Sequence, residues 1–316
     1  MTDDVKITFL SGGTGTPKLL IGFREILSED NMTIIGNIGD DDEFYGLLVS
    51  PDIDTLLYLF SNQLDVTKFW GVNDDTFSCL EQTALLGEES WFQLGDKDIA
   101  LHLLRNKLMT TGLTHSQAIA EISRRLGIRA KIIPISDDSV RTKLITSDDN
   151  YLSFQEYTVK YKEKPEIKAV IYEGSKKAKP VLEVEEVIEN SKTIIIGPSN
   201  PVTSINPMLS IFKFKTALTK TKGKVIAVSP IEGDQAFSGP AARLMKGLKM
   251  EPNALGIATL YRKFLNTFFI SEADEKLAKK IEKLGIKVIC TNISLKTHEE
   301  RVNLAYQIMQ EIEKSD

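Results

Sequence analysis

A run of small residues near the start of the chain has the composition of an anion-binding loop. Residues 11–15 read Ser-Gly-Gly-Thr-Gly and follow an apolar stretch, and Pro17 suits the first position of a helix. Glycines let the backbone approach a ligand closely, and backbone N–H groups at a helix start attract negative charge. The run matches neither a P-loop nor a clean dinucleotide fingerprint, so a plain strand-to-helix turn stays the alternative. The candidates for ligand contact are Gly12, Gly13, Thr14 and Gly15.

Two later loops carry small polar residues after apolar stretches of their own. Residues 197–201 read Gly-Pro-Ser-Asn-Pro, and residues 229–233 read Ser-Pro-Ile-Glu-Gly. A single turn of this kind is ordinarily only a turn. Loops that leave parallel strands, however, share one edge of the sheet, where ligands bind. We therefore expect phosphate or sugar oxygens to be bound by Ser199, Asn200 and Ser229.

Carboxylates gather in several short segments. Asp40 begins an Asp-Asp-Asp run, Asp52 and Asp54 stand on either side of one isoleucine, and Asp274 follows a late apolar stretch. Mg²⁺ in proteins prefers one or two carboxylates together with water and substrate phosphates. We expect Asp40 and Asp274 to hold one Mg²⁺ ion against a diphosphate. Carboxylates such as Asp52 and Asp54 can also accept a proton in acid–base chemistry. Helix capping by Asp54 and a solvated loop at Asp40 are the structural alternatives.

A parallel sheet would bring these loops together, and the hydrophobic pattern predicts one. Strand-like apolar stretches alternate with helical patterns, at residues 5–10, 32–37, 193–196, 225–228, 267–270 and 288–290. We expect a Rossmann-like α/β fold with a mostly parallel sheet and helices on both faces. Residues from about 55 to 128 are expected as a largely helical insertion, and those from about 129 to 175 as a strand-rich segment. Both would lie within a single domain of residues 1–316.

Composition excludes several classes of protein. The 316 residues are 42% hydrophobic and carry a net charge of −5, which argues against a broad nucleic-acid surface. The sequence has no apolar run long enough to span a membrane and no signal-peptide pattern. Two separate cysteines fit a reducing cytoplasm, and the three histidines have no zinc-site spacing.

A lysine-rich stretch is the one strongly charged feature. Residues 160–179 include seven lysines. A solvated loop and hairpin face is the plain interpretation of this stretch. Electrostatic steering of an anionic substrate is the alternative.

Taken in order, the motifs resemble the 2-phospho-L-lactate transferase family. The resemblance runs from residue 7 to about residue 275 with similar spacing. It is carried by Ser-Gly-Gly-Thr-Gly-Thr-Pro-Lys-Leu-Leu at 11–20, Ser-Pro-Asp-Ile-Asp-Thr at 50–55, Leu-Leu-Tyr-Leu-Phe at 56–60, Trp-Gly-x-x-x-Asp-Thr-Phe at 70–77, Gly-Asp-Lys-Asp at 95–98, Gly-Pro-Ser-Asn-Pro at 197–201 and Ser-Pro-Ile-x-Gly at 229–233.

The resemblance implies a specific reaction in the biosynthesis of the deazaflavin coenzyme F-420. The family transfers a lactyl-phosphate group from lactyl-2-diphospho-5′-guanosine to the ribityl hydroxyl of the deazaflavin Fo and releases GMP. It uses Mg²⁺ and is usually a cytoplasmic homodimer. Some relatives transfer a phosphoenolpyruvyl or glyceryl group, and the sequence leaves open which three-carbon acid is used here.

The resemblance also assigns roles to particular residues. Gly12 to Gly15, Ser199, Asn200 and Ser229 would line the guanosine-diphosphate site. Asp40 and Asp274 match the family's metal positions, with Glu272 as the other candidate for the late ligand. Asp52 and Asp54 match the segment that faces the deazaflavin, and Lys97 stands where many members have Arg. Stacking on the deazaflavin, with core packing as the alternative, is expected for Tyr58, Trp70 and Trp91.

Two other classes of protein share parts of this pattern. One is a related family of nucleotide-sugar-binding regulatory proteins linked to gluconeogenesis, and the motifs at 51–55 and 95–98 favour the transferase over it. The other is an NAD-dependent oxidoreductase. An intact Gly-x-Gly-x-x-Gly is missing, and Asn37 stands at the end of the second strand where an acid would bind the ribose.

Overall fold

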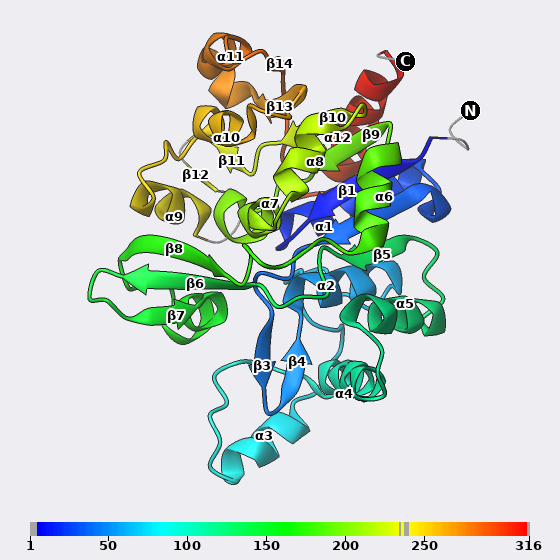
Figure 1. Ribbon diagram of the computed structural model, residues 1–316, viewed down its shortest axis with the longest axis vertical. Helices are drawn as coiled ribbons and strands as arrows, with labels where there is room; N and C mark the ends of the chain where they lie inside the picture. The colour runs from blue at the N-terminus through cyan, green and yellow to red at the C-terminus, as the bar shows by residue number, and fades with distance from the viewer. Residues whose placement is uncertain (1–4, 234, 237–239, 315–316) are drawn as a thin grey trace.

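The computed structural model of the protein describes residues 5–233, 235–236 and 240–314. Its centre is a seven-stranded parallel sheet in the order β14-β13-β10-β9-β1-β2-β5 (Figure 1). The strands are β1 (Ile7–Ser11), β2 (Met32–Gly36), β5 (Lys131–Pro134), β9 (Thr193–Ile196), β10 (Lys224–Val228), β13 (Thr267–Ser271) and β14 (Lys287–Thr291). The parallel sheet predicted from the apolar stretches is therefore confirmed.

The central strands are covered on both faces. Every residue of β1, β9 and β13 is buried. Since successive side chains of a strand point to opposite faces, full burial requires layers on both sides of the sheet. This explains why the strands read as continuous apolar runs such as Thr-Ile-Ile-Ile in β9.

Helices pack closely on this sheet. α1 (Gly15–Ile26) lies against α12 (His298–Glu313). A Cβ atom at Gly22 would overlap the carbonyl oxygen of Arg301, so this helix pair depends on a glycine. Helix α1 starts at Gly15, two residues before the predicted start at Pro17. Further helices in the second half are α6 (Leu182–Asn190), α7 (Asn206–Ser210), α8 (Phe214–Lys220), α9 (Ala241–Gly247), α10 (Ala254–Tyr261) and α11 (Glu275–Glu282).

The segment between β2 and β5 is mostly helical, as predicted, but begins with a hairpin. Its helices are α2 (Pro51–Phe60), α3 (Ser78–Leu85), α4 (Asp96–Thr110) and α5 (His115–Arg125). The strands β3 (Asp42–Phe44) and β4 (Leu47–Val49) pair antiparallel in a segment where the hydrophobic pattern predicted no strand. The hairpin and α3 project from one end of the molecule (Figure 1).

The strand-rich segment forms a separate small sheet. β6 (Arg141–Thr146) pairs antiparallel with both β7 (Tyr151–Ser153) and β8 (Ile167–Glu173). Short elements complete the chain, namely η1 (Glu29–Asn31), η2 (Glu156–Lys160), η3 (Pro201–Ile205), η4 (Glu272–Asp274) and the strand pair β11 (Ile231–Glu232) and β12 (Gln235–Ala236). The grouping of all elements in one domain stays a prediction. Among the described helices, none has the length and apolarity that crossing a bilayer requires.

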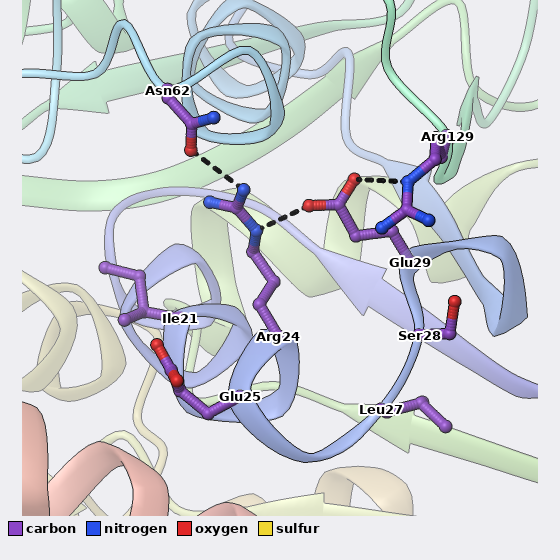
Figure 2. A pocket seen from close by; sticks show the side chains of 8 residues that line it. All are labelled: Ile21, Arg24, Glu25, Leu27, Ser28, Glu29, Asn62 and Arg129. Atoms are coloured by element: carbon purple, nitrogen blue, oxygen red, sulfur yellow. Dashed lines mark hydrogen bonds and ion pairs between the residues drawn. The ribbon is translucent and has the colours of Figure 1, made fainter. Parts of the chain in front are cut away.

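An ion-pair cluster ties the helices together where α1 ends. Here a cavity of about 290 Å³ is lined by charged side chains (Figure 2). Arg24 donates to Glu29 at 2.8 Å, to the carbonyl of Leu59 at 3.0 Å and to the side chain of Asn62 at 2.8 Å. Because α1 ends near this point, the cluster lies at the opposite end of α1 from the glycine loop. Arg24 therefore links the ends of α1 and α2.

Candidate active site

A cavity of about 550 Å³ lies where several strands of the large sheet end. Gly13, Thr14 and Gly15 line it from the loop after β1, Asp40 from the loop after β2, and Asn200 from the loop after β9. The first turns of α2 form a further wall. Ligands of open α/β sheets bind at this edge of the sheet, so the cavity is the candidate active site.

The glycines of the first loop are required by close packing. Gly13 has a φ of +59°, in the left-handed region that glycine favours. A Cβ atom at Gly12 would lie 2.5 Å from Cβ of Ser204, and one at Gly15 would overlap the carbonyl oxygen of Pro198. The loop after β1 and the loop after β9 therefore fit against each other before any ligand binds.

The three polar residues of the later loops have different surroundings. The Ser199 hydroxyl accepts a hydrogen bond from the Gly12 N–H at 3.2 Å and lies 2.5 Å from the hydroxyl of Thr16. The Asn200 side chain accepts from the N–H of Val202 at 2.9 Å and also lines the cavity. Ser229 is buried, its hydroxyl bonds to the backbone of Ile231 in its own turn, and its N–H donates to the carbonyl of Phe269 at 2.9 Å. Of the three, Asn200 is the one that the structure brings to the cavity.

Asp52 connects the glycine loop to the second strand. One carboxylate oxygen accepts from the Gly13 N–H at 2.6 Å, and the other accepts from the Asn37 side chain at 2.9 Å. Burial raises the pKa of Asp52 to about 6, although both hydrogen bonds act to lower it. The carboxyl group thus titrates close to neutral pH on the wall of the cavity.

Asp40 is a buried carboxyl group with an oxygen that has no hydrogen-bond partner. Asp40 lines the cavity, and its buried Oδ1 has no partner within hydrogen-bonding geometry, although the nearby Thr142 hydroxyl acts to lower the pKa of Asp40. Burial, followed by the charges of Asp52 and Asp41, raises the pKa of Asp40 well above its ordinary value. Burial likewise raises the pKa of Asp41 to about 7. The charges of Arg141 and Arg105 act to lower the pKa of Asp41, whereas no cationic side chain is among the groups that shift the pKa of Asp40.

These residues fit a magnesium ion held jointly with a ligand. Within the described ranges, no group of three His, Cys, Asp or Glu side chains is arranged to hold a metal. Mg²⁺ needs fewer protein ligands, because it keeps water and uses substrate phosphates. Asp40, with its unpartnered oxygen, is the residue whose surroundings suit that role.

Asp54 lines the same cavity but is already paired. Its carboxylate binds the guanidinium of Arg105 and lies 3.1 Å from Nε2 of His102. Arg105 is fully buried, and burial lowers the pKa of His102 to about 4, so the imidazole is neutral at pH 7. The helix-capping alternative is confirmed in part. The N–H of Ser50, the residue before α2, donates to the Asp54 carboxylate at 3.2 Å. The structure thus shows Asp54 mainly as the acidic half of a buried ion pair.

Sequence reasoning missed His102 and Arg105. Both lie on α4, and Asp54 is 48 positions from His102 and 51 from Arg105. Their spacing could have indicated a shared role. Residues three or four positions apart share one face of a helix, which places Asp98, His102 and Arg105 on the same face of α4. Asp98 also lines the cavity.

Lys97 lies away from the other candidates. Its side chain is exposed, and its amino group donates to the carbonyls of Asn73 and Asp74 at 2.8 and 2.9 Å. The neighbouring Asp96 accepts from the N–H of Cys79 at 2.9 Å. Residues 95–98 therefore fasten the loop before α3, and Lys97 does not line the cavity.

Asp274 is not brought to Asp40. It follows β13, whereas Asp40 follows β2, and these strands are four positions apart in the sheet. At ~4.8 Å per strand, the strands are separated by roughly 19 Å. Asp274 is buried and accepts from the Gly233 N–H at 3.0 Å, and Glu272 is exposed. Neither lines the cavity that contains Asp40, so the arrangement does not support one metal ion bridging Asp40 and Asp274.

An apolar wall faces the carboxylates. Tyr58 and Trp70 line the cavity, as expected for residues that contact a planar ligand. Trp91 does not line it and instead packs edge-on against Phe92, whose ring stacks on Phe44 with centroids 4.1 Å apart. The apolar wall consists of Val49, Tyr58, Trp70, Phe92, Leu94, Phe154 and Val159.

The fold and this cavity define a Rossmann-like α/β protein with a ligand site at the carboxyl edge of its sheet. The family described as 2-phospho-L-lactate transferase CofD matches residues 7–304. The chain therefore belongs to that family and is an enzyme of the transferase class.

Proteins of methanogenic archaea are similar over nearly their full length. The 2-phospho-L-lactate transferase of Methanococcoides burtonii is 40% identical over 95% of this chain and 97% of its own. That of Methanosarcina barkeri is 41% identical over 93% and 94% of the two chains. That of Methanocaldococcus jannaschii is 40% identical over 96% and 97%.

The fold also occurs in a solved structure of low sequence identity. The crystal structure of a UPF0052-family protein from Bacillus halodurans covers 98% of this chain and 99% of its own, with a TM-score of 0.64 and 19% identity. This likeness concerns the fold alone. The transferase relatives are the comparisons that favour the transferase over a regulatory protein or an NAD-dependent oxidoreductase.

Proposed function

We propose that this enzyme transfers the 2-phospho-L-lactate group from lactyl-2-diphospho-5′-guanosine to the ribityl hydroxyl of the deazaflavin Fo. GMP is released, and the first F-420 intermediate is formed. The observation that carries the proposal is one cavity in which the glycine loop, Asp40 and Asp52 face the apolar wall. Relatives that are about 40% identical are named 2-phospho-L-lactate transferase, which supports the group that is transferred.

The glycine loop would bind the diphosphate. Gly15 opens helix α1, whose first turn has N–H groups without intrahelical partners and a partial positive charge. Gly13 and Thr14 bring the backbone to the cavity without bulky side chains. Asn200 supplies an amide from the adjacent loop. This combination suits phosphate oxygens.

Mg²⁺ would sit at Asp40, with the charge of Asp52 close by. When bound, the ion neutralises charge on the diphosphate. The positive charge would reduce the repulsion between the carboxylates of Asp40 and Asp52 and an anionic donor in the same cavity.

The reaction would be an in-line displacement at the phosphorus that carries the lactyl group. The Fo hydroxyl oxygen bonds to this phosphorus, the bond to the bridging oxygen of GMP breaks, and the hydroxyl proton moves to a carboxylate. Asp52 suits this role better than Asp54, since its pKa is about 6, whereas Arg105 occupies the carboxylate of Asp54. The apolar wall would hold the deazaflavin ring.

Incubation with Fo, Mg²⁺ and a guanosine donor tests this proposal. Lactyl, phosphoenolpyruvyl and glyceryl donors are supplied separately, and the products are identified by mass spectrometry. We expect a lactyl-phospho-Fo product and GMP from the lactyl donor. Absence of any Fo product with all three donors would refute the assignment. Because GDP shares the donor's nucleotide, it should raise the melting temperature, whereas a UDP-sugar or NAD should not.

The expected state of the protein is a homodimer in the cytoplasm, as the family resemblance implies. Sedimentation of the purified full chain tests the first point. A concentration-independent monomer would contradict it.

A further inference from the structure

The cavity of the candidate active site, called the catalytic cavity below, is poorly suited to attract an anion on its own. Its ionisable lining consists mainly of carboxyl groups, namely Asp40, Asp52, Asp54, Asp98 and Glu163. Lys68 is the one lysine among the described lining residues, and it pairs with Asp65 at 3.0 Å. Asp54 is paired with Arg105, so the described lining offers a diphosphate several further carboxyl groups and no lysine without an acidic partner.

A second cavity has the opposite charge. It measures about 590 Å³ and lies between the loop that precedes β8 and helix α9. We call it the basic pocket. Lys162 and Lys164 line it from the loop, and Arg243 and Lys246 line it from the helix, with Glu166 as the one carboxylate among the described lining residues. Figure 1 shows α9 alongside β8.

The basic pocket is held in shape by packing. The guanidinium of Arg243 donates to the carbonyl of Glu163, which ties α9 to the loop. At the other end of α9, a Cβ atom on Gly247 would overlap the carbonyl oxygen of Ile167. Lys162 and Glu163 both have positive φ, +52° and +58°, so the loop makes a tight reversal here. Lys162 and Lys164 thus lie on a fixed turn.

The lysines of the basic pocket have no acidic partner. In the parts of the chain that the structure describes, no ion pair involves Lys162, Lys164 or Lys246. The cavity near Arg24 offers a contrast, because Arg24 and Arg129 there both bind Glu29 (Figure 2). Uncompensated cations around a concave surface create a local positive potential that concentrates anions.

The basic pocket and the catalytic cavity share a wall. Glu163 lines the catalytic cavity, while its neighbours Lys162 and Lys164 line the basic pocket. Pro240, immediately before α9, also lines the catalytic cavity. An anion held in the basic pocket is therefore next to the site where the diphosphate would react.

We propose that the basic pocket is an anion-binding site that captures the diphosphate of the donor before the donor enters the catalytic cavity. The identity of the donor rests on the proposed function, whereas the binding of a diphosphate does not. Capture raises the local concentration of an anion that the carboxylate-rich cavity repels. The lysine-rich stretch thus has a binding role beyond a solvated face.

The first test uses inorganic pyrophosphate with EDTA and no substrate, measured by calorimetry. The pocket variant is Lys162→Glu/Lys246→Glu. The α11 variant, Lys279→Glu/Lys280→Glu, is the control, because it changes the net charge equally and α11 lies away from β8 and α9 (Figure 1). We expect the wild type and the α11 variant to bind pyrophosphate and the pocket variant to lose binding. Equal binding by both variants, or none by the wild type, overturns the proposal.

The second test measures kcat/KM for the lactyl donor with Mg²⁺. The pocket variant should lose about tenfold in kcat/KM at low salt with kcat unchanged, and the loss should shrink at high salt. An unchanged kcat/KM would overturn the capture role. If even the wild type fails to use the donor, the proposed function fails, and the pyrophosphate result still decides whether the basic pocket binds anions. All four lysines are exposed, so unchanged melting temperatures serve as the folding control.

Discussion

The N–H of Gly13 donates to the carboxylate of Asp52 at 2.6 Å, across 39 positions of sequence. This bond joins the glycine loop to helix α2. The other oxygen of Asp52 accepts from Asn37, which follows β2. The carboxylate of Asp52 thus connects the loop after β1 with the loop after β2. We therefore expect its ionisation to affect both stability and activity.

The buried carboxyl groups should lower the free energy of unfolding as the pH rises from about 4 to about 7 in the absence of metal, whereas the buried imidazole of His102, with its pKa lowered to about 4, acts in the opposite direction. Burial raises the pKa of Asp52 from 3.8 to about 6 and that of Asp41 from 3.8 to about 7. The folded state therefore keeps protons that the unfolded chain has already lost, so the contribution of these two groups to the free energy of unfolding falls through this window and is level above it.

Melting temperatures measured across this pH range, with EDTA and with Mg²⁺, check the expectation. Mg²⁺ should restore stability most above pH 7, where the carboxylates are ionised. The variant Asp41→Asn should show a shallower decrease. The same pH dependence of the melting temperature in EDTA for the wild type and Asp41→Asn would contradict proton retention by Asp41.

Gly15→Ala should destabilise the protein and remove activity. The new methyl group would overlap the carbonyl oxygen of Pro198, which forces the loops after β1 and β9 apart. We expect a loss of about 1–3 kcal/mol in the free energy of unfolding, measured by urea denaturation. Gly46→Ala is the matched control, because Gly46 has a φ of +74° but no atom within 4 Å. It should lose about 1 kcal/mol and keep activity. Equal effects of the two substitutions would show that the contact with Pro198 is unimportant.

Residue patterns along the chain predicted most of the large sheet and some of the residues that line one cavity, among them Gly13, Asp40 and Asn200. Buried parallel strands are apolar throughout, so β1, β2, β9, β10 and β13 are recognisable. The hairpin of β3 and β4 was missed because its strands have three residues each and include the exposed Glu43. Hydrophobic periodicity needs longer segments to appear.

The positions of Asp274 and Lys97 could not be predicted for a different reason. Asp274 lies in η4 after β13, and Lys97 lies in the first turn of α4, so their positions relative to Asp40 depend on how the elements are arranged in space. A sequence orders its strands only along the chain, and here β13 is separated from β2 by three other strands. The same limit hid the pairing of Asp54 with Arg105, because the two residues lie on different helices.

Arg105→Met should cause a large loss of stability. The substitution leaves the Asp54 carboxylate buried with His102 as its remaining side-chain partner, at a cost of about 3–5 kcal/mol in the free energy of unfolding. The double variant Asp54→Asn/Arg105→Met should recover much of this loss, since no charge is then unpaired. Arg124→Met, in an exposed pair with Glu121, should leave stability unchanged. A double variant no more stable than Arg105→Met alone would disprove the coupling between the two residues.

Asp40→Asn should remove activity while leaving the fold intact. The substitution removes the carboxylate that would hold Mg²⁺, so we expect turnover to fall by about a hundredfold or more, since even the outer-shell partners of metal ligands are worth about 10–100-fold. Because the pKa of Asp40 is raised mainly by burial, its charge is a cost to the folded protein, and the variant should melt no lower than the wild type in EDTA. The rise in melting temperature on adding Mg²⁺ should disappear. Glu43→Gln, an exposed acid in the following strand, is the control and should behave as the wild type. An Asp40 variant that still responds to Mg²⁺ and turns over normally would show that the metal is held elsewhere.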